Sequence, residues 1–332
     1  MKHDSAETLA EPGARDAAAQ PRPGQADWAR TPERSNMLAL RVIVWIALTC
    51  GRRVTRLILH PISLYFLLFA PTPRRQIKRY LFRAIGPQAG WGDGYRLLHA
   101  FASTVLDRIY FLRGRMDLFD VRVSGNEPVE AEVHAGRGAF MLGAHVGSFE
   151  ALGACRPKAT EDALRLAMLM FTENAQRIMT ILHAIALPEL RPHIIALGRP
   201  HAMLELRDWL DGGGLGGLLA DRTLPAGEEQ RGNNLTLPFL GQPAMFNDGP
   251  FRLAALLRRK VFFMAGLYAG GARYDVRFEP LADFSERLAD PAARERRIRE
   301  AIEAYVARLE ALCREYPYNW FNFHDFWLED AP

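Results

Sequence analysis

The sequence contains little cysteine. Only Cys50, Cys155 and Cys313 occur in 332 residues, and no two of them form a Cys-x-x-Cys pair. This scarcity argues against a disulfide framework and against a thiolate zinc site, and it predicts isolated thiols in a reducing compartment. The chain also lacks a large excess of charge of either sign, because 42 lysines and arginines against 38 aspartates and glutamates leave a net charge of +4. We therefore expect no nucleic-acid partner.

Several catalytic signatures are missing as well. The chain has no Gly-x-Ser-x-Gly elbow, no Walker loop and no His-Glu-x-x-His pair, so serine hydrolase, nucleotide and zinc peptidase functions lose their main support. A Gly-x-Gly-x-x-Gly pattern lies within 212–217, but it follows a predicted helix and precedes a predicted strand, the reverse of the dinucleotide-binding order. We expect a flexible loop there, and we expect neither a metal nor a cofactor.

No apolar run reaches the roughly 20 residues that a membrane-spanning helix needs. The two longest runs, 37–50 and 57–70, are separated by Gly51-Arg52-Arg53. We predict a bent helical hairpin that lies in one leaflet of a membrane, with the arginines at anionic headgroups. A buried helical hairpin of the catalytic domain is the alternative.

Composition also predicts the domain organisation. Residues 1–35 are rich in alanine, proline, glycine and charge, and they predict a disordered tail without a secretory signal, so we do not expect export. The hydrophobic, membrane-associated helical segment follows over 36–72, and the catalytic domain over 73–330.

The remaining pattern predicts a mixed α/β fold. After an amphipathic helix over 91–113, short apolar runs alternate with helical periodicity, which favours a largely parallel sheet covered by helices. The predicted strands are 138–145, 164–171, 193–198, 216–221, 261–268 and 273–280. The predicted helices are 148–155, 174–186, 200–211, 249–259 and 292–315.

The most informative stretch is Gly-Ala-His-Val-Gly-Ser-Phe-Glu over 143–150. It places the imidazole of His145 five residues before the carboxylate of Glu150, across a predicted strand-to-helix turn that Gly147 permits. A carboxylate that holds one ring nitrogen leaves the other to act as a base, which suits the removal of a proton from an attacking hydroxyl. We therefore predict an acyl-transfer site without an enzyme nucleophile. A structural histidine–glutamate pair is the alternative.

Two further stretches contain candidate site residues. Asp221-Arg222 follows a predicted strand, as His145 does, so the arginine is a candidate for holding a phosphate or an oxyanion. A local salt bridge is the alternative for this pair. Asp248-Gly249-Pro250 predicts a helix N-terminus that would receive a phosphate, and a plain cap explains the residues equally well.

The ordered motifs resemble those of a known enzyme family. The 143–150 segment resembles the His-x4-Glu/Asp motif of the lysophospholipid acyltransferase superfamily, in particular its branch of late lipid A acyltransferases and, within that, the acyltransferases of aryl polyene gene clusters. Four more stretches carry the resemblance, which covers residues 37–328: Leu219-Ala-Asp-Arg-Thr, Leu237-Pro-Phe-Leu-Gly-Gln-Pro-Ala, Asp248-Gly-Pro-Phe-Arg-Leu-Ala and Tyr318-Asn-Trp-Phe-Asn-Phe-His-Asp-Phe-Trp.

This resemblance implies transfer of an acyl group from an acyl carrier protein or CoA thioester to a hydroxyl of a lipid or glycolipid, at the cytoplasmic face of the inner membrane. His145 would be the general base, Glu150 its orienting partner and Asp221 a further acidic site residue. Pro238, Phe239 and Gly241 would belong to a turn that lines an acyl channel. The chain departs from the lipid A branch at 169–174, Leu-Met-Phe-Thr-Glu-Asn, where the arginine of a Tyr-Arg-Pro element is missing.

Two other functions stay open at this point. A non-catalytic homologue would bind the lipid or the carrier without turnover, and a thioesterase would use the same base on water. The aromatic residues at 318–327 are expected partly in the core and partly in a belt at the membrane interface.

Overall fold

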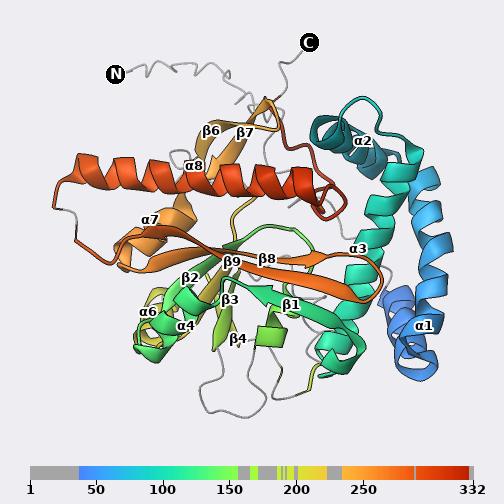
Figure 1. Ribbon diagram of the computed structural model, residues 1–332, viewed down its shortest axis with the longest axis horizontal. Coiled ribbons are helices and arrows are strands. Elements are labelled where there is room, and N and C mark those ends of the chain that lie inside the picture. Colours follow the sequence, from blue (N-terminus) through green and yellow to red (C-terminus); the bar gives the residue numbers. More distant parts are fainter. Residues whose placement is uncertain are drawn as a thin grey trace, which may run out of the picture.

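The computed structural model describes residues 37–155, 165–170, 185–187, 190, 193–197, 201–222, 234–287 and 289–328. A seven-stranded sheet forms its centre in the order β1-β9-β8-β2-β5-β3-β4 (Figure 1). Its strands are β1 (Asp120–Ser124), β2 (Ala139–Gly143), β3 (Leu166–Met170), β4 (His193–Ala196), β5 (Leu215–Leu219), β8 (Lys260–Tyr268) and β9 (Arg273–Asp283). All neighbouring strands run parallel except β8 and β9, which confirms the predicted mixed, largely parallel sheet.

Helices cover this sheet. They are α3 (Trp91–Phe111), α4 (Glu127–His134), α6 (Ala202–Asp211), α7 (Gly249–Leu256) and α8 (Pro291–Glu315). Two further helices pack outside these, α2 (Pro71–Ile85) against α3 and α8, and α1 (Met37–Phe69) on the outer side of α3 (Figure 1). The central strands are apolar and buried: all five residues of β2 lie in the core, as do eight of the nine in β8. Such continuous apolar runs are typical of strands covered on both faces.

The structure adds elements that the periodicity did not predict. These are α2, β1, α4 and the hairpin of β6 (Asn234–Phe239) with β7 (Gln242–Asn247). The hairpin turns through Leu240 and Gly241, whose φ angles of 49° and 82° are left-handed. Two predicted helices have other outcomes: 148–155 is a short 3-10 helix, η3 (Glu150–Cys155), and most of 174–186 lies outside the described residues.

The predicted break at Gly51 is present. Its φ of 80° interrupts α1, which then continues through Pro61 to Phe69. A sharper bend follows, because Val42–Phe69 and Pro71–Ile85 meet at 94°. No single described helix is long and apolar enough to cross a membrane, whereas this bent pair together has the length and composition of a broken span.

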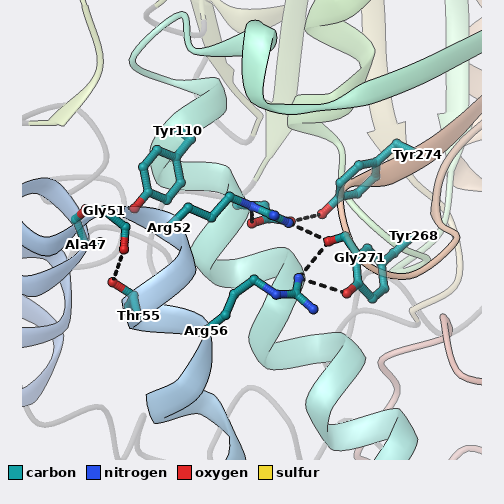
Figure 2. A network of polar contacts seen from close by, with 10 residues as sticks. Ala47, Gly51, Arg52, Thr55, Arg56, Tyr110, Tyr268, Gly271 and Tyr274 are labelled. Atoms are coloured by element: carbon teal, nitrogen blue, oxygen red, sulfur yellow. Dashed lines mark hydrogen bonds and ion pairs between the residues drawn. The ribbon is translucent and has the colours of Figure 1, made fainter.

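A polar network anchors α1 to the sheet (Figure 2). The Arg52 guanidinium contacts both carboxylate oxygens of Asp107 on α3 at 2.7 and 2.8 Å, and Tyr274 donates its hydroxyl to the same carboxylate at 2.8 Å. Arg56 reaches the β8–β9 turn, where it donates to the Tyr268 hydroxyl at 3.0 Å and to the Gly271 carbonyl at 2.7 Å. The prediction that Arg52 contacts lipid headgroups is therefore wrong, because a buried carboxylate in the protein takes its charge.

Candidate active site

The site is built where two adjacent parallel strands end. Gly143 at the end of β2 pairs in register with Leu219 at the end of β5, and the Ala220 amide donates to the Gly143 carbonyl at 3.0 Å. His145 and Asp221 each follow two residues after this pair. Parallel register therefore places an imidazole and a carboxylate at the same height at the carboxyl edge of the sheet, where α/β proteins commonly form their sites.

His145 and Asp221 make a two-point contact. The ring Nδ1 lies 2.8 Å from Asp221 Oδ1, and the His145 amide donates to Oδ2 at 3.0 Å. The carboxylate side chain is 1% exposed, whereas the ring is 27% exposed. Because the carboxylate keeps the proton on Nδ1, Nε2 is the nitrogen that can accept a proton from a substrate.

The carboxylate of Asp221 stays ionised although it is buried. Burial alone would raise its pKa, but attraction to His145, the hydrogen bonds from its ring and amide, and the charge of Arg222 hold the pKa well below its usual range. The indole Nε1 of Trp320 adds another donor at 3.0 Å. Asp221 is thus a fixed anion at the base of the site.

The loop after His145 is folded tightly against β8. Gly147 has a φ of 62° and pairs with Gly266, and a Cβ at Gly147 would lie 2.0 Å from the Gly266 carbonyl oxygen. A Cβ on Gly266 would meet the Ser148 carbonyl oxygen at 2.1 Å. The approach of these two backbones requires glycine on both sides, which explains the predicted role of Gly147 as a turn.

The structure corrects the predicted partner of His145. Glu150 forms an ion pair with Arg108 of α3, with 2.7 Å between Oε1 and Nε, and its Oε2 accepts a hydrogen bond from Ser148 Oγ at 3.2 Å. The close turn at Gly147 carries the chain past the ring toward α3, so the fifth residue faces that helix. The neighbouring strand supplies the ring's carboxylate instead.

The loop offers no exposed nucleophile. Ser148 is 1% exposed, and its hydroxyl donates to Glu150 rather than to the His145 ring. The amides of 145–148 are also occupied, because they donate to Asp221, Ala144, Asn319 and Gly266 in turn. An oxyanion at this site would therefore need donors other than these four amides.

The other predicted site residues lie in two places. Arg222 adjoins Asp221 and contributes positive charge beside it. Phe239 is fully buried, with its ring packed on Trp320 at 5.3 Å between centroids, so it belongs to an aromatic core behind Asp221. Pro238 and Gly241 belong to the same β6–β7 hairpin.

Asp248 and Gly249 begin α7, as predicted. Asp248 is buried, and burial raises the pKa of its carboxyl despite a 2.6 Å contact with Arg252. The Gly249 amide is occupied as well, since it donates to Asn247 Oδ1 at 2.6 Å. The Asp248 carboxylate makes no hydrogen bond to the first amides of α7, so the predicted cap does not form through this side chain.

The sequence reasoning missed the contribution of Trp320. The C-terminal aromatic run was assigned to the core or to a membrane belt, and nothing in its spacing indicated a contact with Asp221.

Within the described ranges, no group of three histidine, cysteine, aspartate or glutamate side chains is placed to hold a metal ion.

Comparison with known proteins gives little further information. No protein-family model matches the chain. No curated protein sequence matches it either. Among solved structures, the 1-acyl-sn-glycerophosphate acyltransferase PlsC of Thermotoga maritima is similar, with a TM-score of 0.34 and 14% identity over 78% of this chain and 98% of that one. A similarity this distant assigns neither family nor activity to the chain.

Proposed function

We propose that this protein is an acyltransferase that moves an acyl group from a thioester to a hydroxyl of a lipid. One observation carries the proposal. The partly exposed imidazole of His145 is held through Nδ1 by the buried carboxylate of Asp221, and the adjoining loop presents no exposed nucleophile. This arrangement suits direct attack by an acceptor hydroxyl activated by a general base. The motif resemblance to lysophospholipid acyltransferases supports the same chemistry.

In the proposed reaction, the acceptor hydroxyl gives its proton to His145 Nε2 while its oxygen attacks the thioester carbonyl carbon. A new C–O ester bond forms, the C–S bond breaks, and the imidazolium returns the proton to the leaving thiolate. Asp221 stabilises the imidazolium and fixes its orientation. Because the loop amides are occupied, Arg222 is the proposed cationic group for the developing oxyanion or for an acceptor phosphate.

The proposed location is a membrane surface. The distribution of side chains on α1 supports it, because polar residues face the protein and many apolar residues are exposed. Its polar residues Arg52, Thr55 and Ser63 face the protein together with Leu59 and Leu67, while ten of its large apolar side chains are exposed. The exposed apolar residues are Val42, Trp45, Leu48, Val54, Leu57, Leu64, Tyr65, Phe66, Leu68 and Phe69. An exposed apolar face of this size is typical of a helix that lies in a bilayer interface.

Basic residues beside this face fit an anionic bilayer. Arg53, Arg75 and Lys78 are exposed, and Phe82 is exposed on α2. We propose binding at the cytoplasmic face of the inner membrane, where a carrier protein or CoA thioester would meet a lipid acceptor. Either Arg222 or Arg177 takes the role of the arginine missing at 169–174, or the acceptor lacks the phosphate that this arginine would meet and is not a lipid A precursor.

Two alternatives use the same site. A thioesterase would direct water at the thioester, and a non-catalytic homologue would bind lipid or carrier only. The intact contact between His145 and Asp221 disfavours a loss of turnover, because a binding protein has no need of an oriented base.

The test is an assay with purified full-length protein in vesicles that contain a total bacterial membrane lipid extract. Acyl carrier protein and CoA thioesters of short, medium and long chains serve as donors, and mass spectrometry identifies the products. We expect acylated lipid from the wild type and about 10²- to 10⁴-fold less from His145→Ala. Free fatty acid alone would indicate a thioesterase, and no consumption of any donor would contradict catalysis.

A further inference from the structure

The segment 318–321 crosses directly behind residues 144–150, the loop that carries His145 and is called the His145 loop below. Phe321 donates its amide to the His145 carbonyl at 2.8 Å, and Asn319 accepts from the Gly147 amide at 2.9 Å. Val146 and Trp320 form an antiparallel bridge between these contacts. The segment therefore pairs like a short strand with the loop that carries His145.

Asn319 sets the register of this segment against β8. Its side-chain oxygen accepts from the Tyr268 amide at 2.7 Å, and its side-chain nitrogen donates to the Tyr268 carbonyl at 3.0 Å. The Asn319 side chain thus bonds the Tyr268 backbone as a neighbouring strand would. These two hydrogen bonds fix the position of the next residue in the chain. That residue is Trp320.

The Trp320 indole is held in one orientation. It is 1% exposed and packs against the rings of Tyr80, Phe239, Phe326 and Trp327, with centroids 4.9 to 6.0 Å away. Its Nε1 donates to Asp221 Oδ2 at 3.0 Å, the same oxygen that accepts from the His145 amide. The indole therefore contacts the carboxylate that holds the catalytic ring, while the ring itself is reached only through that carboxylate.

We propose that Trp320 is a positioning residue for the reaction, which fixes the Asp221 carboxylate and thereby the orientation and basicity of His145. This inference rests on the proposed function. Its physical basis is that a neutral N–H donor draws negative charge from the carboxylate and restrains its rotation. Without that donor, the carboxylate would carry more negative charge and would attract the imidazolium more strongly. The carboxylate could also rotate more freely, so the orientation of the ring would be less well fixed.

Other titratable or charged groups near Asp221 come from its own segment and from two further elements. They are Arg222 beside it in the chain, His145 on the His145 loop, and Tyr305 and Cys313 on α8. Burial raises the pKa of Tyr305 and of Cys313, so both stay neutral in the working range. His145 is thus the neighbour of Asp221 whose charge changes in the proposed reaction, when its ring takes the proton of the acceptor hydroxyl.

The experiment compares Trp320→Phe with a matched control, Trp327→Phe. Both variants remove a buried indole N–H from the same aromatic cluster, but the Trp327 Nε1 donates to the Phe239 carbonyl at 2.9 Å. We expect Trp320→Phe to lower kcat about 10- to 100-fold with little change in KM, and to move the acid limb of the pH–rate profile to higher pH. Trp327→Phe should lose a similar amount of thermal stability and keep the wild-type profile.

A second readout does not require turnover. In protein labelled at histidine, the His145 ring should titrate at higher pH in Trp320→Phe than in Trp327→Phe. If the wild type transfers no acyl group, the proposed function fails, and this titration still decides the role of Trp320. Equal titrations in the two variants, or an unchanged kcat in folded Trp320→Phe, would overturn the proposal.

Should Trp320→Phe not fold, the wild type itself provides the test. With ¹⁵N-labelled tryptophan, one indole signal should follow pH with the midpoint of the His145 ring and should be displaced in Asp221→Asn. The absence of any such indole signal would contradict the proposal.

Discussion

At the scale of single residues, two buried carboxylates, Asp221 and Asp107, are each stabilised by several hydrogen-bond donors. Asp221 accepts from the His145 ring and amide and from Trp320. Asp107 accepts twice from Arg52 and once from Tyr274. A buried carboxylate without such donors would take up a proton or would destabilise the fold. Each of these two carboxylates therefore needs its donors to stay ionised.

Glu132 offers a pH test of this principle. Hydrogen bonds from Arg137 and Lys260 outweigh burial and lower its pKa from 4.5 to about 2. Because the folded-state pKa is depressed, the stabilisation is present above pH 4.5 and is lost as the pH falls toward 2. At pH 7 the urea midpoint of unfolding should be lower for Glu132→Gln than for the wild type. The difference between the two midpoints should narrow as the pH falls from 4.5 to 3. A difference that stays constant with pH would contradict this account.

The residue patterns predicted part of the site. His145 and Asp221 were both placed after buried strands, which proved sufficient to locate them at one edge of the sheet. The partner of the ring was not predictable, because spacing along the chain carries no information on which strand lies next to β2. Trp320 was missed for the same reason, since 99 residues separate it from Asp221.

At the scale of elements, α1 depends on its polar anchor. Its outer face is apolar and exposed, and on its inner face Arg52 and Arg56 contact α3 and the β8–β9 turn beside the buried side chains of Ala47, Leu59 and Leu67. Gly51 permits the change of direction immediately before this anchor.

Asp107→Ala tests the anchor. It leaves the Arg52 guanidinium, whose side chain is 11% exposed, without its carboxylate, and breaking such a pair should cost about 3 to 5 kcal/mol. Hydrogen exchange over 37–69 should accelerate, with a fall in the unfolding midpoint. Glu303→Ala is the control, because it breaks an exposed pair with Arg299 on α8 and should change little. Unchanged protection of α1 in Asp107→Ala would refute the anchor.

Elements with strong apolar periodicity were predicted well. The strands β2, β5, β8 and β9 and the helices α3, α6 and α8 lie where the pattern placed them, within a few residues. β1 was missed because its sequence Asp-Val-Arg-Val-Ser lies largely exposed at the sheet edge and lacks an apolar run. The β6–β7 hairpin was missed because Pro238 and Pro243 interrupt the strand signal, which an isolated hairpin tolerates.

At the scale of the whole molecule, the proposed membrane face and the active site belong to one body through α3. That helix packs on α1, pairs Arg108 with Glu150 of the His145 loop and packs Phe101 on Phe321 of the segment 318–321. A protein bound through α1 would therefore hold the His145 loop at a fixed position relative to the bilayer.

Leu57→Glu tests the membrane face. Leu57 is 67% exposed on α1, so the substitution should leave the fold intact while it removes apolar contact and adds charge of the same sign as the lipid. Flotation with anionic phosphatidylglycerol vesicles should show binding reduced about tenfold or more. Leu256→Glu is the control, because Leu256 is 70% exposed on α7 and lies outside the proposed face. Equal binding by both variants would refute this orientation.

The most direct test of the central claim compares acyl transfer by Asp221→Asn and Glu150→Gln, each in folded, vesicle-bound protein. If Asp221 orients His145, Asp221→Asn should lose about 10²-fold or more of kcat, because an amide neither fixes the tautomer nor stabilises the imidazolium. Glu150→Gln should retain most of its rate, since Glu150 contacts Arg108 and Ser148 rather than the ring. A near-normal rate in Asp221→Asn together with inactive Glu150→Gln would contradict the proposed His145–Asp221 mechanism.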